Sequence, residues 1–244
     1  MAFHLKTSQH PKLNESFIAE SLRALSYIHQ TNKQIRPFVN EQLPYFNPLS
    51  EIGKSAVLAN LRLFNQVCEQ VVASGESVRD SRVMLWHVLK MLDFIFPSDL
   101  FDHITSDHLV EVYDFNNIQI FRNLRFFDVT SYSLEELLCR PWVEIFSRKD
   151  TSQISKITDV LTKMYNKEIL GMVSLEEIGV NRIIETDSPF LLENDALIHF
   201  AAPITNKFKQ VVGYIAIESA QLVTPMPEGR EEERLLNMYY GKKK

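Results

Sequence analysis

The chain has 244 residues, 45% of them hydrophobic and 23% charged, which is typical of a globular protein that buries its core without disulfides or structural metals. Its formal net charge of −5 argues against nucleic acid as a partner, and its two cysteines are too few for a disulfide framework. No stretch has the ~18 consecutive apolar residues of a membrane span, and residues 1–16 lack the apolar run of a signal peptide, so we expect a cytoplasmic protein that contacts no membrane.

Helical periodicity dominates the N-terminal part of the chain. Residues 14–30 carry apolar side chains three and four positions apart, which predicts an amphipathic helix with Asn14 as its N-cap. Residues 50–74 repeat this pattern and are followed by Gly75, a common helix stop. A third helix is expected over residues 77–96, just before a proline. Three such helices can form a bundle, pair with a second copy of the chain or bind another protein.

The hydrophobic period changes to that of strands after these helices. Residues 110–122 predict a hairpin that turns at Asn116 and Asn117, because asparagine tolerates the left-handed backbone of tight turns. Short helical segments follow, and then a longer helix over residues 151–168. Three further strand regions are expected at 172–186, 195–205 and 210–220. This order of elements is typical of an α+β fold with an antiparallel sheet and flanking helices.

These patterns divide the chain into three parts. Residues 1–109 form a helical region suited to dimerisation or partner binding, and residues 110–221 form the α+β domain. Residues 222–244 have two prolines and a glycine near their start, which predicts a linker and a C-terminal tail.

The last two predicted strands are apolar on both faces. In residues 196–202 strict alternation places Leu197, His199 and Ala201 on one face, and Ile198, Phe200 and Ala202 on the other. A strand that is apolar on both faces is expected to be buried on both. We expect the N-terminal helices, from this chain or from a second copy, to cover one face, and on this basis we predict a homodimer.

A set of motif residues spans the predicted hairpin and the segment after it. The first strand ends in Asp114 and a turn, the second ends in Asn123, and an aromatic residue and the run TSYSLEELL over residues 130–138 follow. The closing segments API and VGYI have the form of a final hairpin. Together these features resemble the PAS domain family over about residues 110–221. Ser131 departs from the family pattern, which usually has glycine there.

The resemblance implies a sensor domain with a ligand cavity between the sheet and the short helices. It places near that cavity Asn123, Phe126, Phe127, Tyr132, His199, Ala201 and Tyr214. The cofactor stays open. The position of the family's flavin-reactive cysteine holds Trp142, with Cys139 three residues too early, so covalent flavin chemistry is not expected. The long helix has no histidine for haem, which leaves His199 as the alternative ligand.

No catalytic or metal-binding motif stands out. The sequence has no nucleophile–base signature, no glycine-rich phosphate loop and no zinc-ligand spacing, and the His and Asp residues of 102–108 match no standard metal set. We therefore expect no catalytic residue and no metal ligand. The resemblance implies a non-catalytic sensory protein, with a small-molecule ligand, that passes its signal to a separate signalling protein. A ligand-free adaptor or scaffold and an enzyme of unrecognised type remain as alternatives.

Overall fold

The computed structural model describes residues 10–30 and 43–241 of the chain. Its α-helices are α1 (His10–His29), α2 (Glu51–Ala73), α3 (Ser81–Met91), α4 (Leu134–Cys139), α5 (Trp142–Ile145), α6 (Ser152–Tyr165) and α7 (Arg230–Gly241). Its strands are β1 (Leu109–Asp114), β2 (Gln119–Arg122), β3 (Phe146–Arg148), β4 (Val173–Ser174), β5 (Asn181–Glu185), β6 (Glu193–Thr205) and β7 (Val211–Leu222). Short 3₁₀ helices span Leu100–His103, Leu124–Val129 and Glu176–Ile178. No helix in the described ranges is both long and apolar enough to cross a membrane.

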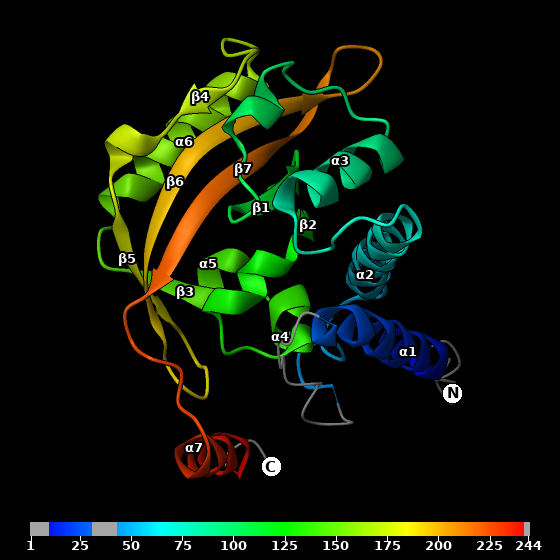
Figure 1. Ribbon diagram of the computed structural model, residues 1–244, viewed down its shortest axis with the longest axis vertical. Coiled ribbons are helices and arrows are strands. Elements are labelled where there is room, and N and C mark those ends of the chain that lie inside the picture. Colours follow the sequence, from blue (N-terminus) through cyan, green and yellow to red (C-terminus); the bar gives the residue numbers. More distant parts are fainter. Residues whose placement is uncertain (1–9, 31–42, 242–244) are drawn as a thin grey trace, which may run out of the picture.

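The seven strands form one curled antiparallel sheet with helices on both sides (Figure 1). Their order is β2-β1-β7-β6-β5-β3, and the short β4 pairs with β6 outside this path. The two longest strands, β6 and β7, lie in the middle, with the hairpin β1–β2 on one side and β5 and β3 on the other. The predicted α+β class, with N-terminal helices before an antiparallel sheet, is confirmed.

The second predicted helix is confirmed at both ends. The Ser50 side chain accepts a hydrogen bond from the Gly53 backbone N–H at 3.1 Å and caps α2. Gly75 follows the helix with a φ of 73°, a left-handed conformation that glycine adopts without steric cost. The third helix is shorter than predicted. Asp80 caps α3 by accepting hydrogen bonds from two backbone N–H groups, and Asp93, with a φ of 53°, stops the chain from continuing as a helix.

One capping assignment near the start of the chain is wrong. Asn14 is not an N-cap, because α1 begins at His10, and its side-chain amide instead donates to Asn47 Oδ1 at 2.8 Å. The expected tail over residues 222–244 contains α7, whose first turn carries three glutamates that favour a helix N-terminus.

The N-terminal helices of the same chain cover one face of the sheet (Figure 1). The side chains of Val110, Val112, Ile215 and Ile217 are buried on this face and belong to one hydrophobic core with α1, α2 and α3. A second copy is therefore not needed to cover the sheet. The homodimer stays a prediction, although the sheet face on which it was based is covered by the helices of the same chain.

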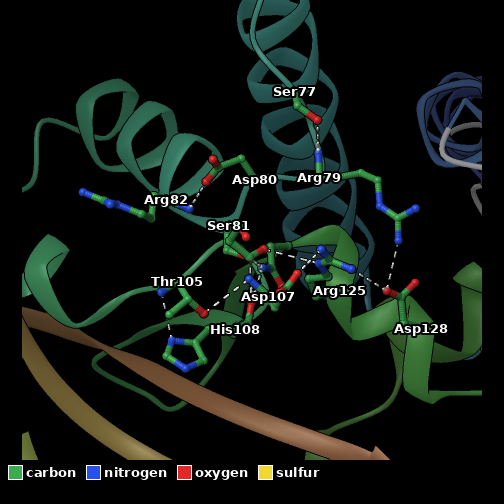
Figure 2. Close-up of polar contacts among 12 residues, drawn as sticks. Ser77, Arg79, Asp80, Ser81, Arg82, Thr105, Asp107, His108, Arg125 and Asp128 are labelled. Carbon is green, nitrogen blue, oxygen red and sulfur yellow. Dashed lines mark hydrogen bonds and ion pairs between the residues drawn. The ribbon is translucent and has the colours of Figure 1, made fainter.

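A polar junction ties the start of α3 to the sheet. The Ser81 hydroxyl lies within hydrogen-bond distance of the carbonyl oxygens of Ser106 (2.8 Å) and His108 (2.7 Å), and it accepts a hydrogen bond from Asn123 Nδ2 at 2.7 Å. Asn123 Oδ1 in turn accepts from the Val110 N–H at 3.2 Å. Figure 2 shows Ser81 and His108 in this junction, which fixes the helices to β1.

A buried glutamate of α4 accepts hydrogen bonds from the segment before α2. Glu135, in the first turn of α4, accepts hydrogen bonds at 2.9 Å from the backbone N–H groups of both Tyr45 and Phe46. Phe46 stacks on Phe17 of α1 with ring centroids 4.3 Å apart. The glutamate thus anchors the aromatic contact between α1 and the segment that precedes α2.

Replacing Glu135 with alanine is expected to lower the free energy of unfolding by about 2–4 kcal/mol, because two backbone N–H groups lose their acceptor and Phe46 lies fully buried beside them. Urea denaturation followed by circular dichroism measures the change. The control is Glu144→Ala, since Glu144 is exposed. An unchanged unfolding midpoint for Glu135→Ala would show that the two hydrogen bonds contribute nothing.

Candidate functional site

A cavity of about 100 Å³ lies on the face of the sheet opposite the N-terminal helices. Helix α6 covers this face, with Leu161 and Met164 packed against Tyr113, Tyr214 and Ala216. The cavity walls are mainly apolar, and the charged and amide side chains that line it are Glu111, Arg122, Arg148, Gln153, Asn181, Asn194 and Glu218. A mainly apolar hollow with a few fixed polar groups is the usual form of a small-molecule site.

Strand register brings the cavity residues of β1 and β7 together. Glu111 lies opposite Ala216, and Tyr113 lies opposite Tyr214, with the two rings stacked and their centroids 4.9 Å apart. Alternate residues of a strand point to opposite faces, so the residues between these positions face the N-terminal helices. Because alanine has almost no side chain, Ala216 leaves room in front of Glu111.

Arg122 is the most buried cation of the site. It lies opposite Glu111 on the neighbouring strand and is only 7% exposed. Its guanidinium lies 4.3 Å from the centroid of the Phe126 ring, and its Nη1 atom has no hydrogen-bond partner in the described part of the chain. Burial lowers the pKa of Arg122, whereas Glu111 and Tyr113 raise it. Arginine stays charged near neutral pH, so the wall of the cavity includes a buried cation.

A pair of carboxyl groups shares the same wall. Burial and the neighbouring Glu111 raise the pKa of Glu218 to about 8, against the opposing effect of Arg148. Glu111 accepts a hydrogen bond from the Tyr113 hydroxyl at 2.7 Å. The guanidinium of Arg148 lies 4.4 Å from the centroid of the Trp142 ring. The wall thus holds two guanidinium groups and two carboxyl groups, of which Glu218 keeps its proton to a higher pH than an ordinary glutamate.

Two asparagines of the cavity also have unsatisfied atoms. Asn181 donates its amide to the Asp150 carbonyl at 3.2 Å, and Asn194 donates to the Val129 carbonyl at 3.0 Å. These bonds fix both side chains, and their Oδ1 atoms are buried without a hydrogen-bond partner among the described residues. Buried polar atoms are nearly always hydrogen-bonded, so these two oxygens are exceptions to the usual pairing.

Three of the seven residues expected near the cavity line it: Phe126, Ala201 and Tyr214. Asn123, Phe127, Tyr132 and His199 do not line it. Asn123 belongs to the polar junction with Ser81. Phe127 faces α2 and packs edge-on against Phe64 with centroids 6.3 Å apart. The Tyr132 hydroxyl accepts from the Thr186 backbone N–H at 2.8 Å and binds the loop after β5.

His199 lies at a β-bulge, which the strict alternation did not anticipate. Ile198 pairs with Glu218 and Phe200 with Ile217, so His199 is an extra residue in β6. The bulge shifts the alternation, and Ile198 and Ala201 consequently both line the cavity. The His199 ring instead lies within hydrogen-bond distance of Glu176 Oε1 and Ser219 Oγ, at 2.9 Å each. Its role is structural in this arrangement, not that of a haem ligand in the cavity.

The charged residues of the cavity were not singled out from the sequence. Glu111 stands between Val110 and Val112, and Glu218 follows an apolar run in β7. A charge inside a strand that is buried on both faces must be paired or functional. This signal is present in the sequence. The position of Glu111 opposite Arg122, however, follows only from the register of the two strands.

The Glu218→Gln variant should be more stable than the original protein at alkaline pH. The pKa of Glu218 is raised from an ordinary value of 4.5 to about 8, so the folded protein holds a proton that the unfolded chain has lost. Stability contributed by this proton is fully present below pH 4.5 and is lost as the pH rises toward 8.

We expect the variant to gain about 1–3 kcal/mol at about pH 9 and to show no gain at about pH 4. This range of free energies is smaller than the full effect of the pKa shift because solvent partly reaches the half-buried Glu218. Urea denaturation at both pH values measures the difference. The same substitution at the exposed Glu228 is the control and should show no such pH dependence. An equal gain at both pH values would contradict the raised pKa.

No group of three His, Cys, Asp or Glu residues able to hold a metal ion occurs within residues 10–30 and 43–241. The chain matches no protein-family model, and a search of the curated proteins returns no match either. Function therefore has to be inferred from the cavity and its surroundings.

Proposed function

We propose that the chain is a non-catalytic, PAS-type sensory or regulatory protein of the cytoplasm. Its cavity binds a small molecule, and its N-terminal helices pass the signal to a separate signalling protein within a homodimer. The observation that carries this proposal is the mainly apolar cavity whose wall holds a few charged and amide side chains, among them Arg122, Asn181 and Asn194. The element order agrees with the PAS resemblance, because an opening hairpin, short helices, one longer helix and a closing hairpin follow one another.

The strands offer a direct route from the cavity to the helices. Glu111 faces the cavity, whereas its neighbours Val110 and Val112 are buried in the core shared with α2 and α3. Tyr214 and Ile215 are related in the same way on β7. A ligand that shifts these strands therefore changes the packing of the helices, and differential binding to two packings is what transmits a signal.

The chemistry of the cavity supports a binding role over a catalytic one. Among the described residues that line it, none is a serine, cysteine, histidine or lysine. These side chains supply most nucleophiles and many general bases. The free thiols of Cys68 and Cys139 lie elsewhere, and unpaired cysteines agree with a reducing cytoplasm.

The ligand-free adaptor remains the second candidate, on one observation. Trp86 of α3 is 49% exposed and packs edge-on against Phe96 and Phe101. Exposed aromatic side chains of this kind are common at protein interfaces. This cluster could serve as the output surface of a sensor or as the main binding surface of an adaptor.

Native mass spectrometry tests the proposal with two variants. We expect the purified protein to be a dimer that carries additional bound mass, and we expect Ala216→Leu, which fills the cavity, to lose that mass. Ala73→Leu makes the same change at an exposed helix position and should retain it. Circular dichroism verifies that each variant is folded. Absence of bound mass from the original protein, under all conditions that preserve the fold, would favour the adaptor.

A further inference from the structure

The loop over residues 105–108 joins the N-terminal helices to the sheet. The Ser81 hydroxyl, in the first turn of α3, lies within hydrogen-bond distance of the carbonyl oxygens of Ser106 (2.8 Å) and His108 (2.7 Å). Asn123, which follows β2, donates its side-chain amide to the same His108 carbonyl at 2.8 Å. These polar contacts between α3 and the sheet therefore depend on the position of the loop (Figure 2).

The shape of the loop depends on a neutral imidazole. The Thr105 backbone N–H donates a hydrogen bond to His108 Nδ1 at 3.2 Å, which Figure 2 shows as a dashed line. A ring nitrogen accepts a hydrogen bond only when it carries no proton, and both ring nitrogens of a protonated histidine are donors. Protonation of His108 therefore breaks this bond and directs two N–H groups at each other.

A second histidine lies against the same ring. The rings of His108 and His199 have centroids 4.9 Å apart. His199 Nδ1 lies 2.9 Å from Glu176 Oε1, and His199 Nε2 lies 2.9 Å from Ser219 Oγ. Both of these oxygens can accept a hydrogen bond, so a protonated His199 keeps its two partners. A proton on His108 would then place a second positive charge beside that of His199.

The other charged groups around the His108 ring offset this repulsion only in part. Asp107 favours the charged form of His108, but it forms an ion pair with Arg125. Burial and His199 lower the pKa of His108, against the opposing effect of Asp107. The remaining charged and titratable side chains of the neighbouring elements are Glu176, which contacts His199, Asp80 and Arg82 at the start of α3, and Asp102 and His103 of the first 3₁₀ helix.

We propose that His108 makes the junction between α3 and the sheet sensitive to pH. At neutral pH the uncharged ring holds the loop over residues 105–108, and the loop holds Ser81 and Asn123. Acidification protonates His108, breaks its bond to Thr105 and loosens the start of α3 from β1. Because α3 is one of the helices that cover the sheet, acidity changes the helical surface of the protein. This inference does not depend on a ligand in the cavity.

The neutral form of His108 stabilises the fold only above a certain pH. The unfolded chain has the ordinary histidine pKa of 6.5, and burial and His199 make the pKa of His108 lower in the folded protein. As the pH falls, the unfolded chain therefore binds the proton first, and the folded state loses stability below pH 6.5. Above pH 6.5 the contribution of His108 is fully present.

Hydrogen–deuterium exchange at about pH 7.5 and about pH 5, corrected for the intrinsic exchange rates and followed by mass spectrometry, tests the proposal. We expect peptides over residues 81–85 and 105–110 of the original protein to exchange about fivefold faster at the lower pH, because the loss of one hydrogen bond corresponds to about that factor. His108→Asn keeps an acceptor oxygen for Thr105 but does not titrate, so it should show no such increase. His103→Asn is the matched control, since His103 is exposed, and it should retain the response.

A second measurement follows the titration of the His108 ring itself by NMR. We expect its midpoint to lie below 6.5 in the original protein. His199→Gln removes the neighbouring charge, so the midpoint and the onset of faster exchange should both move to higher pH. An unchanged midpoint in this variant would contradict the proposal, because a purely structural role of His199 would not move it.

Faster exchange at the lower pH in His108→Asn as well, or equal exchange of the original protein at both pH values, would overturn the proposal. A uniform increase over the whole chain would do the same, because it reports global unfolding. If circular dichroism shows that His108→Asn is unfolded at neutral pH, the shift of the midpoint in His199→Gln decides the matter. The sensory function is tested separately, by native mass spectrometry, and stands or falls independently of these results.

Discussion

Glu185→Ala is expected to destabilise the protein by about 3–5 kcal/mol. Glu185 is 1% exposed and accepts hydrogen bonds from the hydroxyls of Thr130, Ser131 and Ser188 and from the backbone N–H groups of Ser131 and Leu192. Alanine would leave these donors buried without an acceptor. The carboxylate joins the segment before α4 to the loop after β5, so its loss loosens both.

Urea denaturation measures this effect, with Glu177→Ala as the control, because Glu177 is exposed. Glu185→Gln should lie between the two, since an amide keeps one acceptor oxygen but presents an N–H₂ group where Ser131 donates. A loss below about 1 kcal/mol for Glu185→Ala would mean that the donors find water or other partners. Ser131, which stands where the PAS pattern usually has glycine, uses both its backbone and its side chain in this network.

Gly213→Ala should destabilise the protein by about 3 kcal/mol or more. A Cβ atom at this position would lie 2.0 Å from the carbonyl oxygen of Tyr113 on the paired strand. Because the obstructing atom belongs to the backbone, β1 and β7 would have to separate. Such a shift would also move Tyr113 and Tyr214, which stack at the cavity.

Thermal and urea unfolding measure the loss, and Gly171→Ala is the matched control. A Cβ atom at Gly171 would meet no atom within 4 Å, so the control should stay within about 0.5 kcal/mol of the original protein. If Gly213→Ala were as stable as the control, the close approach of the two strands would be incorrect.

Local signals predicted the elements that have their own start and stop residues. Helix α2 has a serine cap and a terminal glycine, and the hairpin β1–β2 turns at Asn117, which has a φ of 60°. Strand β3 was missed because its three residues follow α5 directly, without a turn residue between them. Helix α7 was missed because the prolines before it suggested a linker, although its acidic first turn is a helix signal.

The candidate site was predictable only in part, because it depends on strand register. Phe126, Ala201 and Tyr214 could be placed along the cavity from a family resemblance. Arg122 could not, because its position opposite Glu111 follows from hydrogen bonding between strands. The side of the sheet on which His199 lies depends on a β-bulge, and no residue type in the sequence predicts that bulge.

The bulge at His199 makes the length of β6 as important as its composition. Side-chain direction along a strand has a period of two, so a chain one residue shorter at this point would turn the first half of β6 over. Glu193, Asp195 and Leu197 would then replace Asn194, Ala196 and Ile198 along the cavity. Two acidic groups would enter the hollow, and Arg182, which now pairs with both of them, would lose its partners. A single-residue deletion in this strand is therefore expected to change the cavity more than a substitution of His199 itself.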